Sequence, residues 1–232
     1  MGKIKNPLSK KVLSSNWLIT LTSTMLGVLL GLYLNSYYEN KKLIEAKEKA
    51  LEQVLKEVSE NEEILTSYNS ALKSKFDPLM YLFSKLNEDG EILVHKDSIK
   101  IFKESSKNII SIENIQEKSA NFYQINGTFD FHLDSPLLFK GLSNVTWQSY
   151  KQTNYLSITN FRCLIDFEGL YELQEEVNKL NYNWRETFVN ENFFENIVFR
   201  NKLAKQMRNL IIKQNLLLDL YKYRENVLKN CD

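Results

Sequence analysis

An uncharged run of 18 residues, from Trp17 to Leu34, stands out near the start of a chain whose other segments mix apolar and charged positions. As a helix with a rise of about 1.5 Å per residue, it would be about 27 Å long, close to the roughly 30 Å hydrocarbon core of a bilayer. Trp17 stands at one end, and Tyr37 and Tyr38 at the other, where an aromatic ring can bury its body and keep its polar atom in water. The pattern predicts a transmembrane helix over 17–38, surrounded by the membrane lipid bilayer, with these aromatic residues at the membrane interface.

A cleaved signal peptide is the competing interpretation, because four lysines precede the run as they would in the n-region of such a peptide: Lys3, Lys5, Lys10 and Lys11. The apolar region of a signal peptide is about 7–15 residues, shorter than this one. The exit sequence from Tyr33 to Tyr38 also lacks the small-x-small pattern of a cleavage site. We therefore expect an uncleaved anchor.

The orientation of this anchor depends on the charges that flank it. Similar numbers of lysines lie on its two sides, so the positive-inside rule alone does not decide. The basic tail over 1–16 contains no acid, whereas the lysines after the run alternate with glutamates. Because moving an unopposed charge outward costs about 2.3 kcal/mol per 100 mV, we expect a cytoplasmic N-terminus. The sequence thus predicts a single-pass protein of the cell inner membrane whose C-terminal domain is periplasmic or extracellular.

Small residues follow one face of the predicted span: Ser23, Gly27, Gly31 and Asn35 recur every four positions. Small side chains at this spacing let two helix backbones approach closely, as in many transmembrane dimers. The face is therefore a candidate contact with another membrane helix, including one from a second copy. A lipid-facing position is the alternative, because glycine is common in membrane helices.

The segment over 39–75 contains no glycine or proline, and apolar residues recur in it every seven positions, at Ile44, Leu51, Val58, Leu65 and Leu72. The matching d positions are less apolar: Lys47, Val54, Asn61, Tyr68 and Lys75. This pattern favours a helix that packs on its own domain over a free two-stranded coiled coil. No helix breaker separates it from the span, so we expect the transmembrane helix to continue into a stalk helix.

The remainder, 76–232, predicts a helical extracytoplasmic domain. Asp77-Pro78 and Asp89-Gly90 bound a short expected helix, and another is expected over 98–111. A long irregular loop follows over 119–141, with a brief extended segment around Phe129. Helices are then predicted from Ser143 to about 153 and from about 159 onward, and one more long helix follows. In the two long helices, apolar positions recur at 3–4 residue spacing, including Leu170, Val177, Trp184, Leu203, Leu210 and Leu217. The predicted fold class is all-α, a helical bundle with one irregular loop.

Residues 141–178 combine a tryptophan helix, a threonine-centred turn, Leu-x-Ile and a helix that carries Tyr-x-Leu-Gln. The matching positions are Trp147, Thr153, Leu156, Ile158, Tyr171 and Gln174. The segment resembles one that recurs in uncharacterised bacterial membrane proteins with a basic N-terminal tail, one transmembrane helix and a helical extracytoplasmic domain. The resemblance implies the architecture and no activity.

The search for chemistry is mostly negative. The sequence has no phosphate-binding glycine loop and no HExxH, GxSxG or CxxC motif. His132 with Asp130 and Asp134 would share one side of an extended strand, but solvated loop residues are the more common case. We therefore expect no enzymatic activity, cofactor, catalytic residue or metal site. The net charge of +1 gives no reason to expect a nucleic-acid partner.

Cys163 and Cys231 are the only cysteines. A domain outside the cytoplasm would allow one disulfide between them, and two buried or free thiols are an equal alternative.

The expected function follows from the architecture, because a tail over 1–16 is too short to hold an effector domain. We predict a non-enzymatic protein-binding or scaffold protein, an accessory subunit of a membrane complex. Its partners would be other membrane or periplasmic proteins, or itself as a homo-oligomer. The alternative is an extracytoplasmic ligand-sensing domain that signals through a partner protein.

Overall fold

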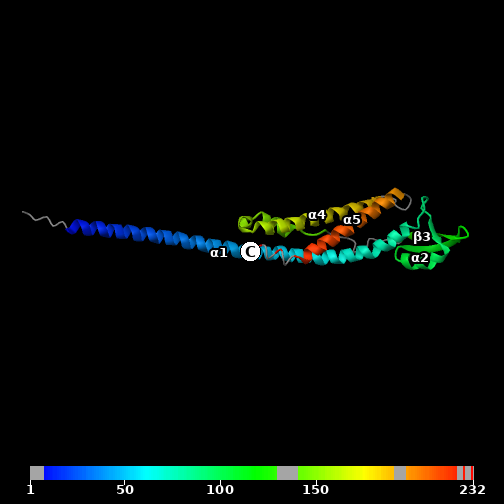
Figure 1. Ribbon diagram of the computed structural model, residues 1–232, viewed down its shortest axis with the longest axis horizontal. Helices are drawn as coiled ribbons and strands as arrows, with labels where there is room; N and C mark the ends of the chain where they lie inside the picture. Colours follow the sequence, from blue (N-terminus) through cyan, green and yellow to red (C-terminus); the bar gives the residue numbers. More distant parts are fainter. Residues whose placement is uncertain (1–7, 130–140, 191–196, 224–226, 228–230, 232) are drawn as a thin grey trace, which may run out of the picture. The chain divides into compact units, whose positions relative to one another are not determined.

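A computed structural model describes residues 8–129, 141–190, 197–223, 227 and 231 (Figure 1). The chain divides into two compact units, Met1–Glu52 and Gln53–Asp232, and one long helix, α1, contributes to both. The described fold is mostly helical with a small antiparallel sheet. Its elements are α1 (Leu8–Phe83), β1 (Ile92–His95), η1 (Lys96–Ser98), α2 (Ile99–Ser106), β2 (Ile110–Glu117), β3 (Phe122–Phe129), α3 (Val145–Lys151), η3 (Asn154–Ile158), α4 (Phe161–Asn190) and α5 (Ile197–Lys222).

Helix α1 continues through Pro78, so the expected break at Asp77-Pro78 is wrong. A proline inside a helix removes one backbone hydrogen bond and crowds the preceding turn. The residues after it offset that cost, because Leu79 and Leu82 are both fully buried and keep the last turns of α1 against the core. The helix ends at Phe83, and a turn further along contains Gly90, with a φ of 79°.

Helices α1 and α4 run parallel in the second unit. Asn61 of α1 bonds to Gln174 of α4, and Tyr68, further along α1, bonds to Asn181, further along α4. Helix α5 runs the opposite way. Figure 1 shows α4 and α5 side by side along this part of α1.

The direction of α5 follows from two contacts with α1 and the turn after it. Asn69 donates to Gln214 Oε1 at 3.1 Å, whereas Arg200, earlier in α5, donates to the carbonyl oxygen of Asn87, which follows α1. The described part of the unit is thus built around three long helices.

The core of this bundle lies along the predicted apolar stripes. On α1, the heptad positions from Val54 to Leu72 are buried, including the polar d residue Asn61 at 1% exposure. On α4 and α5, the predicted positions are buried as well: Leu170, Val177, Trp184, Leu203, Met207, Leu210, Leu217 and Tyr221. The expectation that the stalk segment packs on its own domain is confirmed for α1 from Val54 onward.

A three-stranded antiparallel sheet of order β1-β3-β2 corrects the all-α expectation. Helix α2 ends at Ser106, so the helix expected over 98–111 is too long, and Ile110 begins β2. Strand β3 lies inside the loop expected over 119–141, and residues 130–140 of that loop lie outside the described residues. Gly127 lies opposite Ile112, and a side chain there would clash with the carbonyl oxygen of Ser111, so the strand pairing requires glycine at this position.

Candidate functional site

The predicted membrane span is an exposed apolar helix. Every large apolar or aromatic side chain between Trp17 and Tyr38 exposes 51–69% of its surface. None of the most apolar window of α1 is buried, which distinguishes it from a core helix of a soluble protein. Leaving this much apolar surface in water is unfavourable at about 25 cal/mol per Å². The segment is therefore a candidate membrane span.

Two threonine side chains in the span bond to the backbone of the same helix. Thr22 Oγ1 donates to the carbonyl oxygen of Leu18 at 2.9 Å, and Thr24 Oγ1 donates to that of Thr20 at 2.7 Å. In hydrocarbon, where no water is available, such internal bonds remove the cost of an unsatisfied hydroxyl.

The small-residue face of the span is open in this chain. No described atom lies within 4 Å of where a side chain would begin at Gly27 or Gly31. At the far end of the same face, Asn35 Nδ2 donates to Glu39 Oε1 at 3.0 Å. Ser23 is exposed as well. The face is therefore open at Gly27 and Gly31.

The predicted interface aromatics are exposed at the two ends of the span: Trp17 by 66%, Tyr37 by 57% and Tyr38 by 61%. The rings of Tyr37 and Tyr38 meet edge to face, with centroids 6.1 Å apart. The 22 residues from Trp17 to Tyr38 correspond to about 33 Å of helix, which suits the thickness of a bilayer core.

A short extended segment is held between α1 and α4 by two asparagines. Asn61 accepts from the Ser143 backbone N–H at 2.9 Å and donates to the Ser143 carbonyl oxygen at 2.8 Å. Asn178 likewise accepts from the Leu142 backbone N–H at 2.9 Å and donates to the Leu142 carbonyl oxygen at 3.1 Å. Each amide thus replaces the paired bonds of a neighbouring strand, and together they fix the path of the chain into α3. We call Leu142 and Ser143 with these two asparagines the amide clamp.

Glu57 of α1 extends the amide clamp. Its Oε2 accepts from Ser143 Oγ at 2.7 Å and from the Thr146 backbone N–H at 3.0 Å, and its Oε1 accepts from the Tyr171 hydroxyl at 2.8 Å. The N-cap residue of α3, Asn144, makes no side-chain cap bond, so Glu57 supplies the cap from another helix. Burial would raise the pKa of Glu57, but the bonds from Thr146, Ser143 and Tyr171 together lower it. Burial and the nearby Glu57 carboxylate raise the pKa of Tyr171, which stays a hydroxyl donor.

Trp147 packs beside the clamp in a stack of aromatic rings. Its ring lies parallel to that of Tyr171, with centroids 5.7 Å apart, and close to parallel with Tyr150 at 5.6 Å. Its indole N–H donates to Glu168 Oε2 at 3.0 Å. Of the residues that carry the family resemblance, Trp147 and Tyr171 therefore meet in one buried cluster.

The other resemblance residues have local and bridging roles. Gln174 donates to the Ser143 carbonyl oxygen at 2.7 Å and accepts from the Tyr221 hydroxyl at 2.7 Å, so it links the clamp to α5. Thr153 accepts from the Tyr155 backbone N–H at 3.2 Å and starts η3. Leu156 and Ile158 lie within η3.

A second polar layer crosses the core further along α1. The Tyr68 hydroxyl donates to Asn181 Oδ1, which also accepts from the Trp184 indole N–H at 2.9 Å. Burial raises the pKa of Tyr68 to about 12, so this hydroxyl remains protonated at physiological pH. The polar groups of this layer are thus used to pair helices.

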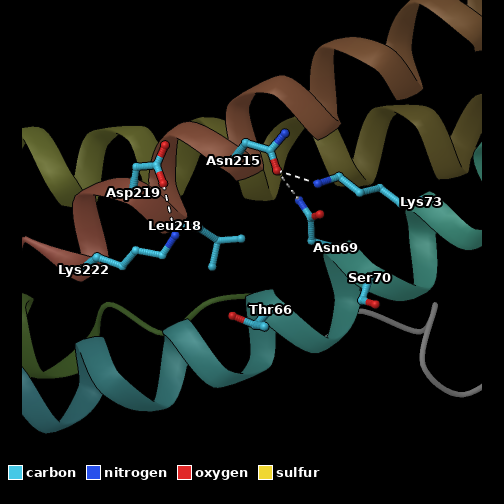
Figure 2. A pocket seen from close by; sticks show the side chains of 8 residues that line it. All are labelled: Thr66, Asn69, Ser70, Lys73, Asn215, Leu218, Asp219 and Lys222. Carbon is cyan, nitrogen blue, oxygen red and sulfur yellow. Dashed lines mark hydrogen bonds and ion pairs between the residues drawn. The ribbon is translucent and has the colours of Figure 1, made fainter.

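An open hollow of about 500 Å³ lies between α1 and α5 (Figure 2). Amide, hydroxyl and charged side chains line it: Thr66, Asn69, Ser70, Lys73, Asn215, Leu218, Asp219 and Lys222. Lys73 Nζ donates to Asn215 Oδ1 at 2.8 Å, and Lys222 Nζ lies 3.2 Å from Asp219 Oδ1. Such a lining offers donors to a small polar or anionic molecule and lacks an acid–base pair arranged for catalysis.

Apolar side chains gather on the outer side of α5. Ile212, Leu216, Leu220 and Tyr223 recur at 3–4 residue spacing and expose 57, 49, 36 and 62% of their surfaces. We call these four residues the outer α5 face. A stripe of this kind on a helix suits contact with another protein.

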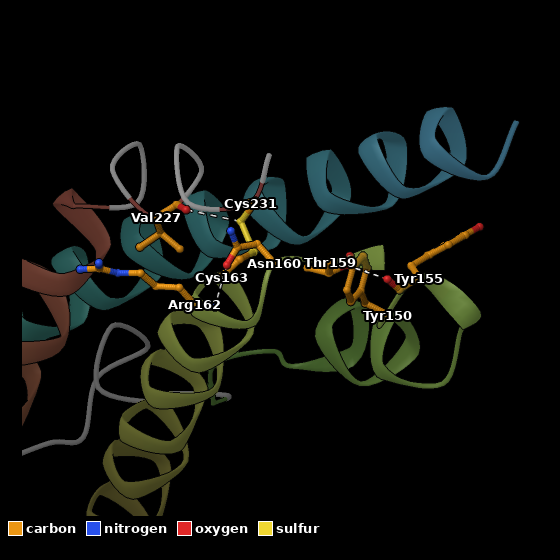
Figure 3. Close-up of a disulfide and its surroundings, with 8 residues drawn as sticks. All are labelled: Tyr150, Tyr155, Thr159, Asn160, Arg162, Cys163, Val227 and Cys231. Atoms are coloured by element: carbon orange, nitrogen blue, oxygen red, sulfur yellow. Dashed lines mark hydrogen bonds between the residues drawn. A yellow bond between two sulfur atoms is a disulfide. The ribbon is translucent and has the colours of Figure 1, made fainter. Parts of the chain in front are cut away.

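Cys163 and Cys231 are joined in the structure, with an S–S distance of 2.05 Å (Figure 3). Cys163 is fully buried and Cys231 is 2% exposed. The bond ties the C-terminal end of the chain to the first turn of α4.

Nothing in the described part of the chain forms a metal centre, since no group of three His, Cys, Asp or Glu side chains is placed to hold an ion. The histidine and aspartates at 130–134 lie outside the described residues. His95 lies against Asp97, with Nδ1 3.3 Å from Oδ2, and its ring contacts Phe122.

Comparisons with known protein families, with characterised protein sequences and with solved structures found no match to this chain. The resemblance of residues 141–178 to uncharacterised bacterial membrane proteins therefore stays a prediction.

Proposed function

We propose that this chain is a membrane-anchored, non-enzymatic protein-binding or scaffold protein that serves as an accessory subunit of a membrane complex. The observation that carries the proposal is the exposed apolar helix from Trp17 to Leu34, in one continuous helix with a folded bundle. A chain built in this way holds its bundle at a membrane surface, where it meets other membrane proteins.

The proposed arrangement puts the tail over 1–16 in the cytoplasm, the span over 17–38 in the inner membrane, and the stalk and bundle in the periplasm or outside the cell. The acid-free basic tail supports this orientation. The joined cysteines support it as well, since disulfides persist in oxidising compartments and are rare in the cytosol.

Binding of proteins is favoured over catalysis by how the bundle uses its polar groups. Glu57, Tyr171, Gln174 and Asn181 all bond to other side chains or to the backbone of the bundle. The outer α5 face, in contrast, exposes apolar surface without a cover from the described residues. The partner would be a membrane or periplasmic protein, or a second copy of the chain.

Purification from native membranes in a mild detergent tests this proposal. The intact chain should bring a partner in constant ratio, and Ile212→Gln with Leu216→Gln should lose that partner while the abundance of the chain stays normal. The matched control is Glu172→Gln with Glu175→Gln, on the exposed side of α4, which should keep the partner. Recovery of the wild-type chain alone as a monomer contradicts the proposal.

The hollow between α1 and α5 favours a second candidate function, ligand sensing with signalling through a partner. Its ammonium, amide and hydroxyl groups suit a small anionic molecule, such as a carboxylate or a phosphate ester. A set of such compounds should raise the melting temperature of the wild-type chain and leave that of Lys73→Met unchanged. If none of these compounds raises the melting temperature of the wild-type chain, this candidate function is wrong.

A further inference from the structure

An open hollow of about 410 Å³ lies between α4 and α5. Its lining combines one residue of α4, Leu180, with five residues of α5: Lys205, Gln206, Arg208, Asn209 and Ile212. Most of the lining surface is apolar although only Leu180 and Ile212 are apolar residues, so the carbon chains of the polar residues form much of its wall. Because Ile212 also belongs to the outer α5 face, the hollow and this face form one continuous surface.

Two cations line this hollow without a partner among the described residues. Lys205 and Arg208 are exposed, and neither makes an ion pair or a hydrogen bond with a described residue. Lys213, the next basic residue of α5, is matched, because its Nζ lies 2.9 Å from Glu176 Oε2. Between Lys205 and Lys213, α5 has no acid, and α4 from 176 to 186 contains two acids and two bases. The hollow therefore presents two positive charges that an acidic occupant would neutralise.

Gln206 adds an unsatisfied acceptor to the wall of the hollow. Its Oε1 atom is buried and accepts no hydrogen bond from a described residue. An unsatisfied buried oxygen is unfavourable, and the terminal amide of a glutamine turns easily, so an occupant with an N–H or O–H group would remove this cost. A polypeptide supplies such donors, whereas the acyl chain of a lipid has none. The chemistry of the hollow thus favours a polypeptide over a lipid chain.

The exposed positions along this side of α5 have the spacing of a contact between two helices. They follow one another at steps of three or four residues, as in the seam of a coiled coil: Lys205, Asn209, Ile212, Leu216, Leu220 and Tyr223. From Lys205 to the end of α5, this stripe is about 26 Å long. An amphipathic helix whose own apolar residues recur at the same spacing covers such a stripe, whereas an extended strand, with its period of two, does not match it.

A second copy of α5 matches the apolar part of this surface but not its charges. The only acid of α5 is Asp219, and its Oδ1 already lies 3.2 Å from Lys222 Nζ. A second α5 therefore brings six basic residues and no spare carboxylate to Lys205 and Arg208. The charges favour a different partner, one that carries acids.

We infer that the hollow between α4 and α5, together with the outer α5 face, binds an acidic amphipathic helix of a partner protein. This inference rests on the proposed protein-binding function and describes the partner that this function requires. Apolar residues of the partner helix cover Ile212, Leu216 and Leu220, and its aspartates or glutamates pair with Lys205 and Arg208.

Photocrosslinking of the full chain in native membranes tests the inference. p-Benzoylphenylalanine replaces Asn209, which lines the hollow, or Tyr182, an exposed residue of α4 that does not line it and serves as the control position. Mass spectrometry then identifies the sequence of the segment that is attached at each position.

Two charge reversals measure the role of the cations. Lys205→Glu with Arg208→Glu changes the hollow, and Lys100→Glu with Lys103→Glu is the matched control, because it reverses two exposed lysines at the same spacing on α2. Thermal unfolding shows that each variant folds. Both pairs are introduced into the chain that carries the crosslinker at Asn209.

The expected result is a crosslink from Asn209, and not from Tyr182, to a segment of another protein with several acids and with apolar residues at helical spacing. Its yield should fall about tenfold after reversal of Lys205 and Arg208, because two attractions become repulsions, and should stay unchanged in the α2 control. An equal fall in both reversals, or none in either, overturns the acidic recognition.

Other outcomes separate this inference from the proposed function. A crosslink from Asn209 to lipid or to a second copy of the chain overturns the inference, and the second copy leaves protein binding intact. If Asn209 yields no crosslink while the purified chain still brings a partner in constant ratio, the inference is wrong and the proposed function stands. Recovery of the chain alone as a monomer removes both.

Discussion

Replacement of Asn61 removes one side of the amide clamp. This side chain is 1% exposed and makes three hydrogen bonds, two with the backbone of Ser143 and one with Gln174 Oε1. In Asn61→Leu, the Ser143 carbonyl oxygen keeps the bond from Gln174 Nε2, but the Ser143 N–H loses its acceptor. An unsatisfied group costs about 1–3 kcal/mol and each lost bond about 0.5–1.5 kcal/mol, so we expect a loss of about 2–4 kcal/mol in the free energy of unfolding.

Asn61→Asp keeps the shape of the side chain but changes the hydrogen bonds that it can make. One oxygen still accepts from the Ser143 N–H, while the other takes the place of the amide nitrogen and faces the Ser143 carbonyl oxygen and Gln174 Oε1. Only a protonated carboxyl can donate there, so folding raises the pKa of the new group above its unfolded value of about 3.9. The stability contributed by the protonated form is complete below the unfolded pKa and is lost as pH rises through the folded pKa. The difference in free energy of unfolding between this variant and the wild type should therefore shrink as the pH is lowered.

Denaturant unfolding of the full chain in detergent micelles, followed by the fluorescence of the buried Trp147 and Trp184, measures both effects. The matched control is Asn201→Ala, an exposed asparagine on α5, which should change the stability by about 0.5 kcal/mol or less. A loss below about 0.5 kcal/mol in Asn61→Leu, or a pH-independent deficit in Asn61→Asp, would refute the clamp.

Three further predictions concern other parts of the molecule. Glu57→Gln should lower the free energy of unfolding by about 1–3 kcal/mol at neutral pH. Because folding lowers the pKa of Glu57 below 4.5, the wild type should lose this advantage as the pH falls below that value. The free energies of unfolding of the two proteins should therefore converge at low pH, and a constant difference would contradict the cap. Reduction of the Cys163–Cys231 bond, which spans 68 residues, should lower the free energy of unfolding by about 2–4 kcal/mol, whereas maleimide labelling of both cysteines in the unreduced, folded chain would show that they are free thiols. Gly27→Leu with Gly31→Leu should leave insertion and abundance unchanged, since both positions are open within the chain, but should yield a smaller species in native gels; an unchanged assembly would mean that this face contacts lipid.

The apolar periodicity of the sequence predicts the long helices, because burial along a helix depends on local spacing. The positions from Val58 to Leu72 on α1 and from Leu203 to Leu217 on α5 are buried as their spacing indicates. The same pattern marks Asn61 as an anomaly at a d position, but not its partners. Ser143 lies 82 residues away and Gln174 lies 113 away, and such pairings are properties of the folded bundle.

The sheet and the end of α1 show where local signals mislead. Ile109 and Ile110 are adjacent and both buried, which fits the end of a helix as well as the start of a strand, and the expected helix ran on to Ser111. A register shift between Ile112 and Asn114 also breaks the alternation that would have marked β2 as a strand. At Pro78, the local preference for a break is overridden by tertiary burial, which no single window of sequence contains.

Among the site residues, a sequence can predict those defined by composition, such as a candidate span, but not those defined by contacts. The span and its aromatic ends are visible in the order of apolar residues alone. Nothing in the sequence distinguishes Glu57 from the other glutamates of a charged helix, or Asn178 from other helical asparagines. Their role depends on the path of Leu142 and Ser143 between two helices, which only the fold reveals.

The central claim is that the span from Trp17 to Leu34 crosses the membrane once and holds the bundle outside the cytoplasm. Labelling of single introduced cysteines in intact cells with a membrane-impermeant maleimide tests it most directly. Asp89→Cys, at an exposed turn after α1, should react without permeabilisation, whereas Lys3→Cys in the basic tail should react only after it. Protection of Asp89→Cys together with labelling of Lys3→Cys would reverse the topology. Labelling of neither before permeabilisation would place both ends in the cytoplasm and contradict the single crossing.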